Sequence, residues 1–250
     1  MNNLKKTLYI LSFLLLNCCA TTPVNSKTKT PPTKSFVKIL HTISISSCQE
    51  DYKQGCPIGA YSRSGSGMAI QVEKNLMTVV TAGHVCDAQP DLKKINKYSQ
   101  TTNVIDFHGR IHQAWRIHHT FVDGTGSGDH CLLWVPTLEA PQVRVAIKPP
   151  TTGERVRYLG APLGVYHYPT VAIFEGIFSG IVDASSSLVT FPAIGGASGS
   201  AVLNEKGKVI GILFASTERF HHLTLITNYK SFLLFIKQSR KIINNKSFNQ

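Results

Sequence analysis

The stretch GGASGSAV at residues 195–202, followed by the apolar run VIGIL at 209–213, decides the fold. Glycines on both sides of Ser198 allow a backbone turn to present its hydroxyl beside main-chain amide donors. Upstream, TVVTAGHV at 78–85 leads an apolar strand to His84, and DHCLLWV at 129–135 opens another strand with a carboxylate. The chain therefore carries a histidine, an aspartate and a serine in that order, 45 and 69 residues apart.

These three residue types fit nucleophilic catalysis. A serine hydroxyl is a weak nucleophile at neutral pH, so a base must take its proton as it attacks. His84 is the candidate base, since imidazole can accept this proton and return it, and Asp129 is the candidate that orients it. Asp123 is an alternative carboxylate; we prefer Asp129 because the apolar residues 132–135 follow it at once. The alternative reading of Ser198 is an ordinary glycine-rich turn.

The three stretches resemble the chymotrypsin-like (trypsin-fold) serine endopeptidases, in their bacterial-type branch, and GSGMAI at 65–70 is similar to the strand before the histidine in those enzymes. The resemblance implies an all-β fold in which two antiparallel six-stranded β-barrels pack together with the active site between them. It covers a domain at about 36–243. Within it, we expect an N-terminal barrel at about 36–140, a C-terminal barrel at about 141–227 and a C-terminal α-helix at about 228–243.

The resemblance also implies roles for individual residues. His84, Asp129 and Ser198 would form the catalytic triad of an enzyme that acts on protein or peptide substrates without a cofactor. The oxyanion hole would consist of the backbone N–H groups of Gly196 and Ser198.

Three positions differ from the specialised branches of that family. Ala197 stands where the trypsin branch carries an aspartate that pairs with a newly cut N-terminus, so we expect that activation switch to be absent. Pro192 replaces the acid of enzymes that cut after Lys or Arg, and Leu213 replaces the histidine of glutamyl endopeptidases. The implied substrate pocket is lined by Pro192, Ala193, Leu213, Phe214, Ala215 and Ser216. We therefore expect a preference for small or medium uncharged side chains.

The composition agrees with a β-rich domain. A chain of 250 residues with 42% hydrophobic content can bury one substantial core or two small ones. Short apolar or alternating stretches, separated by turn residues, predict strands around 39–45, 77–81, 143–147, 171–174, 188–191 and 209–214. Apolar residues at helical spacing after 231, with basic residues between them, predict an amphipathic C-terminal helix. A short tail at 244–250 follows.

The N-terminal residues indicate export. Residues 1–20 place two lysines before an apolar stretch whose length suits a signal peptide and is too short to span a bilayer. Two outcomes remain open: cleavage after Ala20, which gives a secreted or periplasmic protein, or lipidation of Cys18 or Cys19, which anchors the chain to a membrane. Residues 21–35, rich in Thr, Pro and Lys, have the composition of a flexible linker.

Four cysteines remain beyond the N-terminal pair. Cys48 and Cys56 are close enough in sequence to close a short loop. Cys86 and Cys131 each follow a candidate triad residue by two positions, so the geometry that joins His84 to Asp129 should bring these thiols together, as a disulfide or as a buried thiol pair. The spacing of the four lacks the close ligand pairs of structural zinc sites.

The formal net charge of +12 makes attraction to acidic surfaces or substrates plausible. The basic residues are scattered and form no recognised nucleic-acid motif, so nucleic acid is not expected as the primary partner. The pairs at 118–119 and 221–222 put neighbouring histidines on opposite faces of an extended chain, which disfavours a metal site. Nothing in the sequence indicates an oligomeric state.

The sequence thus predicts an exported serine endopeptidase. The alternative is a catalytically silent envelope or peptide-binding protein that keeps the same fold, and a further one is a structural lipoprotein. Labelling with a fluorophosphonate probe distinguishes the enzyme from both.

Overall fold

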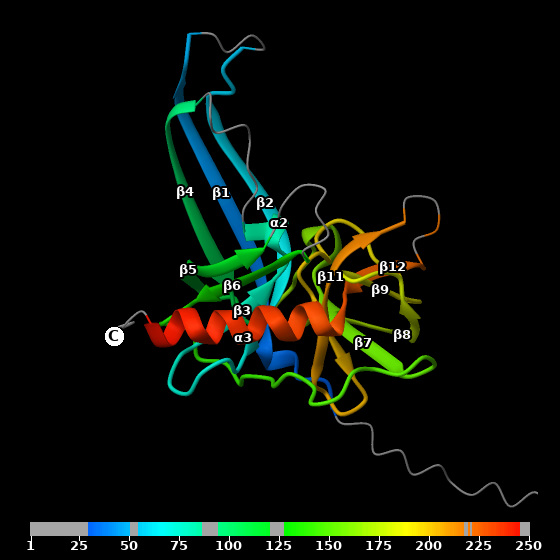
Figure 1. The fold of residues 1–250 in the computed structure, drawn as a ribbon. Helices are drawn as coiled ribbons and strands as arrows, with labels where there is room; N and C mark the ends of the chain where they lie inside the picture. Colours follow the sequence, from blue (N-terminus) through cyan, green and yellow to red (C-terminus); the bar gives the residue numbers. More distant parts are fainter. Residues whose placement is uncertain are drawn as a thin grey trace, which may run out of the picture.

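The computed structural model describes residues 30–50, 55–86, 95–120, 128–217, 220 and 222–245. Two closed antiparallel β-barrels of six strands each make up most of the molecule, and a long C-terminal helix lies across them (Figure 1). This is the architecture that the resemblance implies. The strand order is β1-β2-β3-β6-β5-β4 in the first barrel and β10-β11-β12-β9-β8-β7 in the second.

The strands of the first barrel are β1 (Phe36–Cys48), β2 (Gly59–Ile70), β3 (Thr78–Thr81), β4 (Ile95–Ile105), β5 (Ile111–Thr120) and β6 (His130–Trp134). Those of the second are β7 (Arg155–Gly160), β8 (Ala172–Ile181), β9 (Ser186–Val189), β10 (Ala201–Asn204), β11 (Val209–Ser216) and β12 (Thr224–Thr227). The helical elements are η1 (Thr33–Ser35), α2 (Gly83–Cys86), η3 (Pro162–Gly164) and α3 (Tyr229–Asn245).

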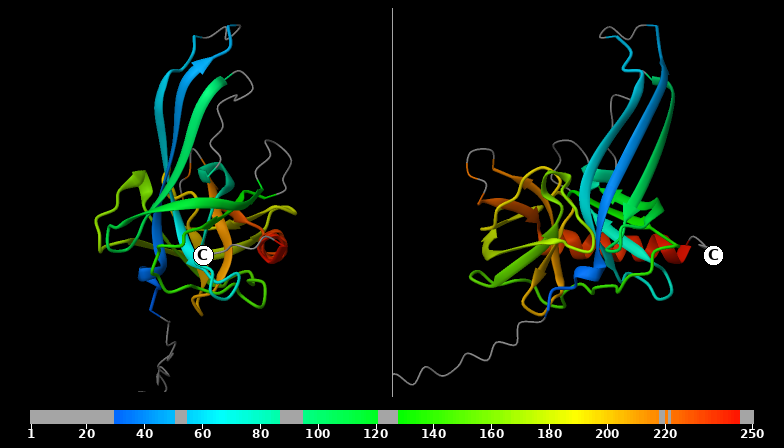
Figure 2. Two further views of the ribbon diagram at one scale, coloured as in Figure 1. Left: turned by 90° about the vertical axis from the view of Figure 1, so that its left-hand side faces the viewer. Right: turned by 180° about the vertical axis from the view of Figure 1, so that it is seen from behind.

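Three strands of the first barrel extend far beyond it as an arm (Figures 1 and 2). β1 is the middle strand of this arm and pairs with β2 on one side and β4 on the other. Ile43, Ile45 and Ile95 form a small apolar cluster there, separate from the main core, and a disulfide between Cys48 and Cys56 packs against it. The arm therefore carries its own apolar contacts and its own covalent link.

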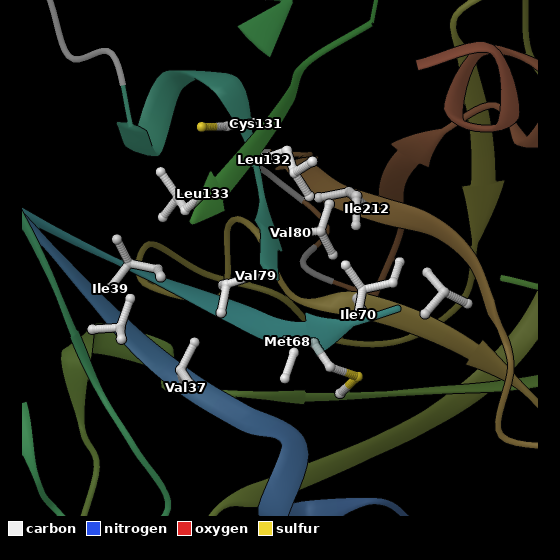
Figure 3. Close-up of a cluster of buried hydrophobic side chains, with 14 of the residues drawn as sticks. Val37, Ile39, Met68, Ile70, Val79, Val80, Cys131, Leu132, Leu133 and Ile212 are labelled. Atoms are coloured by element: carbon white, nitrogen blue, oxygen red, sulfur yellow. The ribbon is translucent and has the colours of Figure 1, made fainter. Parts of the chain in front are cut away.

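The main core fills the first barrel and continues into the second. Met68 of β2, Val80 of β3 and Leu132 of β6 lie on one face of the first barrel's strands, and Ile212 of β11 in the second barrel lies against them (Figure 3). Alternation along each strand turns these side chains toward the second barrel, and it turns the neighbouring residues 79 and 133 to the opposite face, inside the first barrel. Because one apolar cluster contains residues of both barrels, the two are packed as one unit.

Helix α3 covers one side of both barrels, in contact with β5, β6 and β11. Asn228 caps it, since its Oδ1 accepts a hydrogen bond from the backbone N–H of Lys230 at 2.9 Å. Its buried positions recur at helical spacing and include Phe232, Phe235, Ile236, Ser239 and Ile243. Among the described residues, no helix has the length and apolar character needed to cross a membrane.

One strand prediction is wrong. Residues 143–147 form only isolated bridges, Val143 with Ile70 and Val145 with Val209, and the side chain of Ile147 is 97% exposed. Prolines at 141, 149 and 150 flank this segment and restrict the backbone there. The other strands lie within a few residues of their predicted places, and α3 ends at Asn245, two residues later than expected.

The N-terminal predictions lie mostly outside the described residues. This applies to the signal segment 1–20 with Cys18 and Cys19, to the linker up to residue 29, and to residues 246–250. The last part of the expected linker is folded, since η1 occupies Thr33–Ser35 and Ser35 is buried.

Candidate active site

His84 lies in the single-turn helix α2, directly after the buried strand β3. β3 pairs with β6 so that Thr81 lies opposite Cys131. The chain after Thr81 and the chain before Cys131 therefore start from the same end of this strand pair. This register brings together His84 and Asp129, which are 45 residues apart in the sequence.

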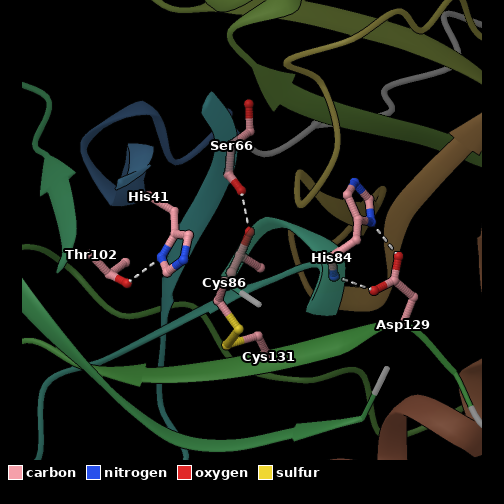
Figure 4. Close-up of a disulfide and its surroundings, with 8 residues drawn as sticks. His41, Ser66, His84, Cys86, Thr102, Asp129 and Cys131 are labelled. Carbon is pink, nitrogen blue, oxygen red and sulfur yellow. Dashed lines mark hydrogen bonds and ion pairs between the residues drawn. A yellow bond between two sulfur atoms is a disulfide. The ribbon is translucent and has the colours of Figure 1, made fainter. Parts of the chain in front are cut away.

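Asp129 binds His84 at two points. One carboxylate oxygen, Oδ2, lies 2.5 Å from Nδ1 of the imidazole, and the other, Oδ1, accepts a hydrogen bond from the His84 backbone N–H at 2.8 Å (Figure 4). The Asp129 side chain is 11% exposed and that of His84 is 29% exposed. Partial burial strengthens the interaction. With Nδ1 held by the carboxylate, Nε2 is the ring nitrogen that can exchange a proton with a substrate or a nucleophile.

A disulfide between Cys86 and Cys131 holds the same two elements together. It joins α2 to β6 with the two Cα atoms 6.5 Å apart, and both cysteines are buried (Figure 4). Of the two arrangements that the sequence leaves open for this pair, the structure has the disulfide. The disulfide closes a loop of the chain that begins at Cys86 and ends at Cys131.

Ser198 lies in the loop before β10, on the second barrel. Its carbonyl oxygen accepts a hydrogen bond from the backbone N–H of Ser66 on β2 at 2.8 Å. Gly65 shows how closely the two barrels approach: a Cβ on it would lie 2.7 Å from Val85 of α2 and 2.9 Å from the Ser198 carbonyl oxygen. The backbone of the nucleophile candidate and the helix that carries His84 therefore abut the same glycine.

The backbone before Ser198 takes a left-handed conformation at Gly196. Gly196 has φ +90°, and a Cβ there would lie 2.5 Å from the carbonyl oxygen of Ala161 and 2.7 Å from the Gly164 nitrogen. Only glycine fits this position without displacing backbone. Within the described part of the chain, no acceptor is found for the N–H groups of Gly196 and Ser198. These two amides are the candidates for an oxyanion hole.

The predicted pocket residues come from two neighbouring segments. Ala193 and Leu213 are buried, and Phe214, Ala215 and Ser216 are half-buried at the end of β11. The Pro192 carbonyl accepts a hydrogen bond from the Tyr158 hydroxyl at 2.7 Å. Burial raises the pKa of Tyr158, so this hydroxyl stays protonated and donates. Tyr158 was not predicted from the sequence, because it lies on β7 without any motif around it.

Other candidates fall in different places. Asp123, the alternative carboxylate, and His221 lie outside the described residues. His118 stacks on Phe235 of α3 and its Nδ1 lies 2.9 Å from the Ser239 hydroxyl, which is an ordinary packing role. Ser66 is a polar residue that sequence reasoning missed, although its position between two glycines was a signal.

The comparisons with known proteins agree with this geometry. The family model of the trypsin-like peptidase domain matches residues 65–212. The chain is similar to the active form of the Rv3671c protease from M. tuberculosis, with 19% identity over 82% of this chain and 81% of that chain and a TM-score of 0.58. It is also similar to the serine endoprotease from Yersinia pestis, with 17% identity over 81% of this chain and 62% of that chain and a TM-score of 0.56. No curated protein sequence matched the chain.

At these identities the solved structures show the fold, and the family model supplies the class. It spans more than half of the chain, from the middle of β2 to the middle of β11. The chain belongs to the trypsin-like peptidase domain family and is a serine endopeptidase.

Proposed function

We propose that the chain hydrolyses peptide bonds through an acyl-enzyme on Ser198. His84 takes the hydroxyl proton through Nε2 as Oγ attacks the scissile carbonyl, and Asp129 stabilises the imidazolium that forms. The amides of Gly196 and Ser198 bind the oxyanion. His84 then passes the proton to the leaving amine as the C–N bond breaks. Water attacks the acyl-enzyme in the same way, releases the acid and restores Ser198. No cofactor takes part.

The two-point contact between Asp129 and His84 is the observation that carries this proposal. A carboxylate that binds both the ring and the backbone of one histidine fixes its tautomer and its position. The Ser198 backbone lies against the same part of β2 as α2 does. A nucleophile, an oriented base and a pair of amide donors are the parts that acyl transfer requires.

The test compares Ser198→Ala and His84→Ala with the wild-type enzyme on peptide substrates. Each substitution should lower turnover by several orders of magnitude, because the residues act as a unit. Retention of more than about a tenth of the activity by Ser198→Ala contradicts the assignment. A catalytically silent binding protein would instead give no turnover in the wild type, with peptide binding that the Ser198→Ala substitution leaves unchanged.

We also propose a preference for small or medium uncharged side chains before the cut. A charged substrate side chain would lose its solvation against Pro192, Ala193 and Leu213 without gaining a partner of opposite charge. Ser216 adds bulk at the wall of the pocket. Profiling with a peptide library tests this proposal, and dominant cleavage after Lys, Arg, Asp or Glu contradicts it.

The site of action is proposed to lie outside the cytoplasm. Two disulfides fit an oxidising compartment, and residues 1–20 have the pattern of an export signal. Mass spectrometry of the mature N-terminus distinguishes cleavage after Ala20 from lipidation of Cys18 or Cys19. An N-terminus that begins at Met1 on exported protein contradicts both.

A further inference from the structure

Ser66 uses all of its hydrogen-bonding groups at the junction of the two barrels. Its backbone N–H donates to the Ser198 carbonyl at 2.8 Å, and its carbonyl accepts from the Thr81 hydroxyl at 2.7 Å. Its own hydroxyl donates to the Gly196 carbonyl at 2.8 Å and accepts from the Ala161 backbone N–H at 2.9 Å. The residue is completely buried. Ser66 therefore joins β2 of the first barrel to residues 195–198 of the second, which we call the oxyanion loop.

The glycines around Ser66 make this contact feasible. A Cβ at Gly65 would lie 2.9 Å from the Ser198 carbonyl oxygen, and a Cβ at Gly67 would lie 3.1 Å from side chains of Ile39 and Val79. A side chain at Gly65 would push β2 away from the loop that carries Ser198, and a side chain at Gly67 would crowd the packing of the first barrel. The Gly-Ser-Gly sequence thus places one hydroxyl, and nothing larger, between the barrels.

The oxyanion loop needs an external support. Two adjacent glycines, Gly195 and Gly196, give its backbone more freedom than any other pair of residues would. The side chain of Ala197 is a buried methyl group, which cannot hold the loop through a hydrogen bond. The carbonyls of the two glycines are instead held from outside: that of Gly195 accepts from the Leu163 N–H at 2.6 Å, and that of Gly196 accepts from the Ser66 hydroxyl.

These two bonds fix the peptide planes on both sides of Gly196. A trans peptide is planar, so holding the Gly195 carbonyl toward Leu163 turns the Gly196 N–H to the opposite side. The bond to the Gly196 carbonyl fixes the plane of the peptide between Gly196 and Ala197, and therefore the direction in which the backbone continues to Ser198. The hydroxyl of Ser66 has one proton, and because its oxygen already accepts from Ala161, that proton is directed to Gly196.

We propose that Ser66 is a positioning residue of the peptidase, whose hydroxyl holds the oxyanion loop so that the Gly196 amide can bind the developing oxyanion. The inference rests on the proposed function of Ser198. The Ser66 hydroxyl would preorganise the oxyanion hole in a chain that has Ala197 where the trypsin branch carries an aspartate. Catalysis depends on donors that are in place before charge develops, so loosening this loop should affect the transition state more than substrate binding.

The experiment compares Ser66→Ala with Thr78→Val. Both changes delete a buried hydroxyl that donates a hydrogen bond in the first barrel's strands. The Thr78 hydroxyl donates to the Ile70 carbonyl at 2.6 Å, within the first barrel, whereas the Ser66 hydroxyl donates to the oxyanion loop. For each variant, kcat and KM are measured on a peptide substrate. The affinity for a peptide boronate, which forms a tetrahedral adduct with the nucleophile, is measured separately. Thermal unfolding of both variants reports the loss of stability that they share.

Ser66→Ala should lower kcat about 10- to 100-fold, less than the loss of a direct oxyanion donor, which is worth about 100- to 1,000-fold. KM should stay within about threefold, and boronate affinity should fall by the same factor as kcat. Thr78→Val should keep both quantities within about threefold of wild type. If Ser66→Ala does not fold, Ser66→Cys, with a weak S–H donor, carries the test and should show an intermediate loss.

Equal kcat and equal boronate affinity in the Ser66 and Thr78 variants would overturn the inference, as would a Ser66→Cys enzyme with wild-type turnover. The wild-type enzyme is measured first. If its Ser198 does not react with the boronate, the proposed function itself fails and the inference fails with it. If Ser198 reacts equally well in wild type and in Ser66→Ala, only the role of Ser66 is rejected.

Discussion

Asp129 makes two hydrogen bonds to His84, and they respond differently to loss of charge. Its Oδ1 accepts from the His84 backbone N–H, while Oδ2 contacts Nδ1. In Asp129→Asn, the amide oxygen can keep the first contact, but the NH₂ group then donates to Nδ1 and selects the wrong tautomer. We expect the fold to persist and turnover to fall by about 10⁴.

Asp106→Asn is the matched control for this change. Asp106 is also a buried carboxylate of the first barrel, and it accepts hydrogen bonds from the backbone N–H groups of His108 and Arg110 and from the Arg110 side chain. These bonds hold the pKa of Asp106 below its usual value against the opposing effect of burial. Asp106→Asn should therefore lower the free energy of unfolding and leave kcat nearly unchanged. A ranking of kcat in the opposite order contradicts the role of Asp129.

Gly196 offers a second test at the scale of one residue. Gly196→Ala would place a methyl group 2.5 Å from the Ala161 carbonyl oxygen, so the oxyanion loop must move. Gly153 shares φ +90° but has open space where a Cβ would lie. Gly153→Ala should cost about 1–2 kcal/mol of stability for its left-handed backbone and keep full activity. Gly196→Ala should lose at least about 100-fold in kcat. Similar kcat values in the two variants would show that the Gly196 amide has no part in the reaction.

At this scale the sequence predicts residues that lie within a recognisable stretch, such as His84 and Asp129, whose contact the structure contains. It does not predict Ser66 or Tyr158. The hydroxyl of Ser66 acts on partners 95 and 130 positions away, and that of Tyr158 acts on a carbonyl 34 positions away. Such contacts depend on how two barrels pack, and no local pattern of residues encodes that packing.

At the scale of elements, the two disulfides should differ in their contribution to stability. The Cys86–Cys131 link closes a loop with a sequence separation of 45, against a separation of 8 for Cys48–Cys56. The chain-entropy model gives about 4 kcal/mol for the longer loop and about 2.6 kcal/mol for the shorter. Urea unfolding of the two double serine variants should show this order. A larger loss from the Cys48/Cys56 variant would mean that the arm stabilises the protein more than loop closure does.

The contact between β6 and helix α3 should make stability depend on pH. His130 is buried, its ring stacks on Phe232 and Phe235, and its Nδ1 lies 3.1 Å from the Thr120 hydroxyl. Burial lowers the pKa of His130 to about 3, although nearby Asp129 opposes this. The unfolded chain, with a pKa of about 6.5, binds the proton first as pH falls, so stability decreases below about pH 6.5.

From pH 7 to pH 5 this group should remove about 2 kcal/mol from the free energy of unfolding. His130→Asn keeps a polar atom near Thr120 but does not titrate, so its stability should fall less over that range. His222→Asn changes an exposed histidine and serves as the control. Urea unfolding at both pH values measures the difference. The same acid sensitivity in His130→Asn and wild type would place the titrating group elsewhere.

Strand prediction succeeded where a stretch carried its own pattern and failed where the surroundings decided. Residues 78–81 are apolar and β-branched and form β3, whereas the similar stretch 143–147 forms only bridges. Prolines on both sides keep the latter from joining a ladder. The extension of β1, β2 and β4 into an arm was also not predicted, because strand length beyond a barrel depends on which neighbours continue to pair.

The whole molecule is two barrels joined by one apolar cluster that contains residues of both, and the order of histidine, aspartate and serine predicts a site between them. The resemblance predicts this arrangement because each barrel must supply part of the site: the first carries His84 and Asp129, and the second carries Ser198. The net charge of the whole chain, +12, should favour encounter with acidic substrates at low salt, but it does not determine which peptide bond is cut.

The central claim is that Ser198 is the nucleophile. Purified protein treated with a fluorophosphonate probe should gain the mass of one phosphonyl group, and peptide mapping should place it on the Oγ of Ser198. His84→Ala should abolish the modification, because the hydroxyl then has no base. Modification of another residue, or a wild-type protein that stays unmodified while correctly folded, would contradict the claim.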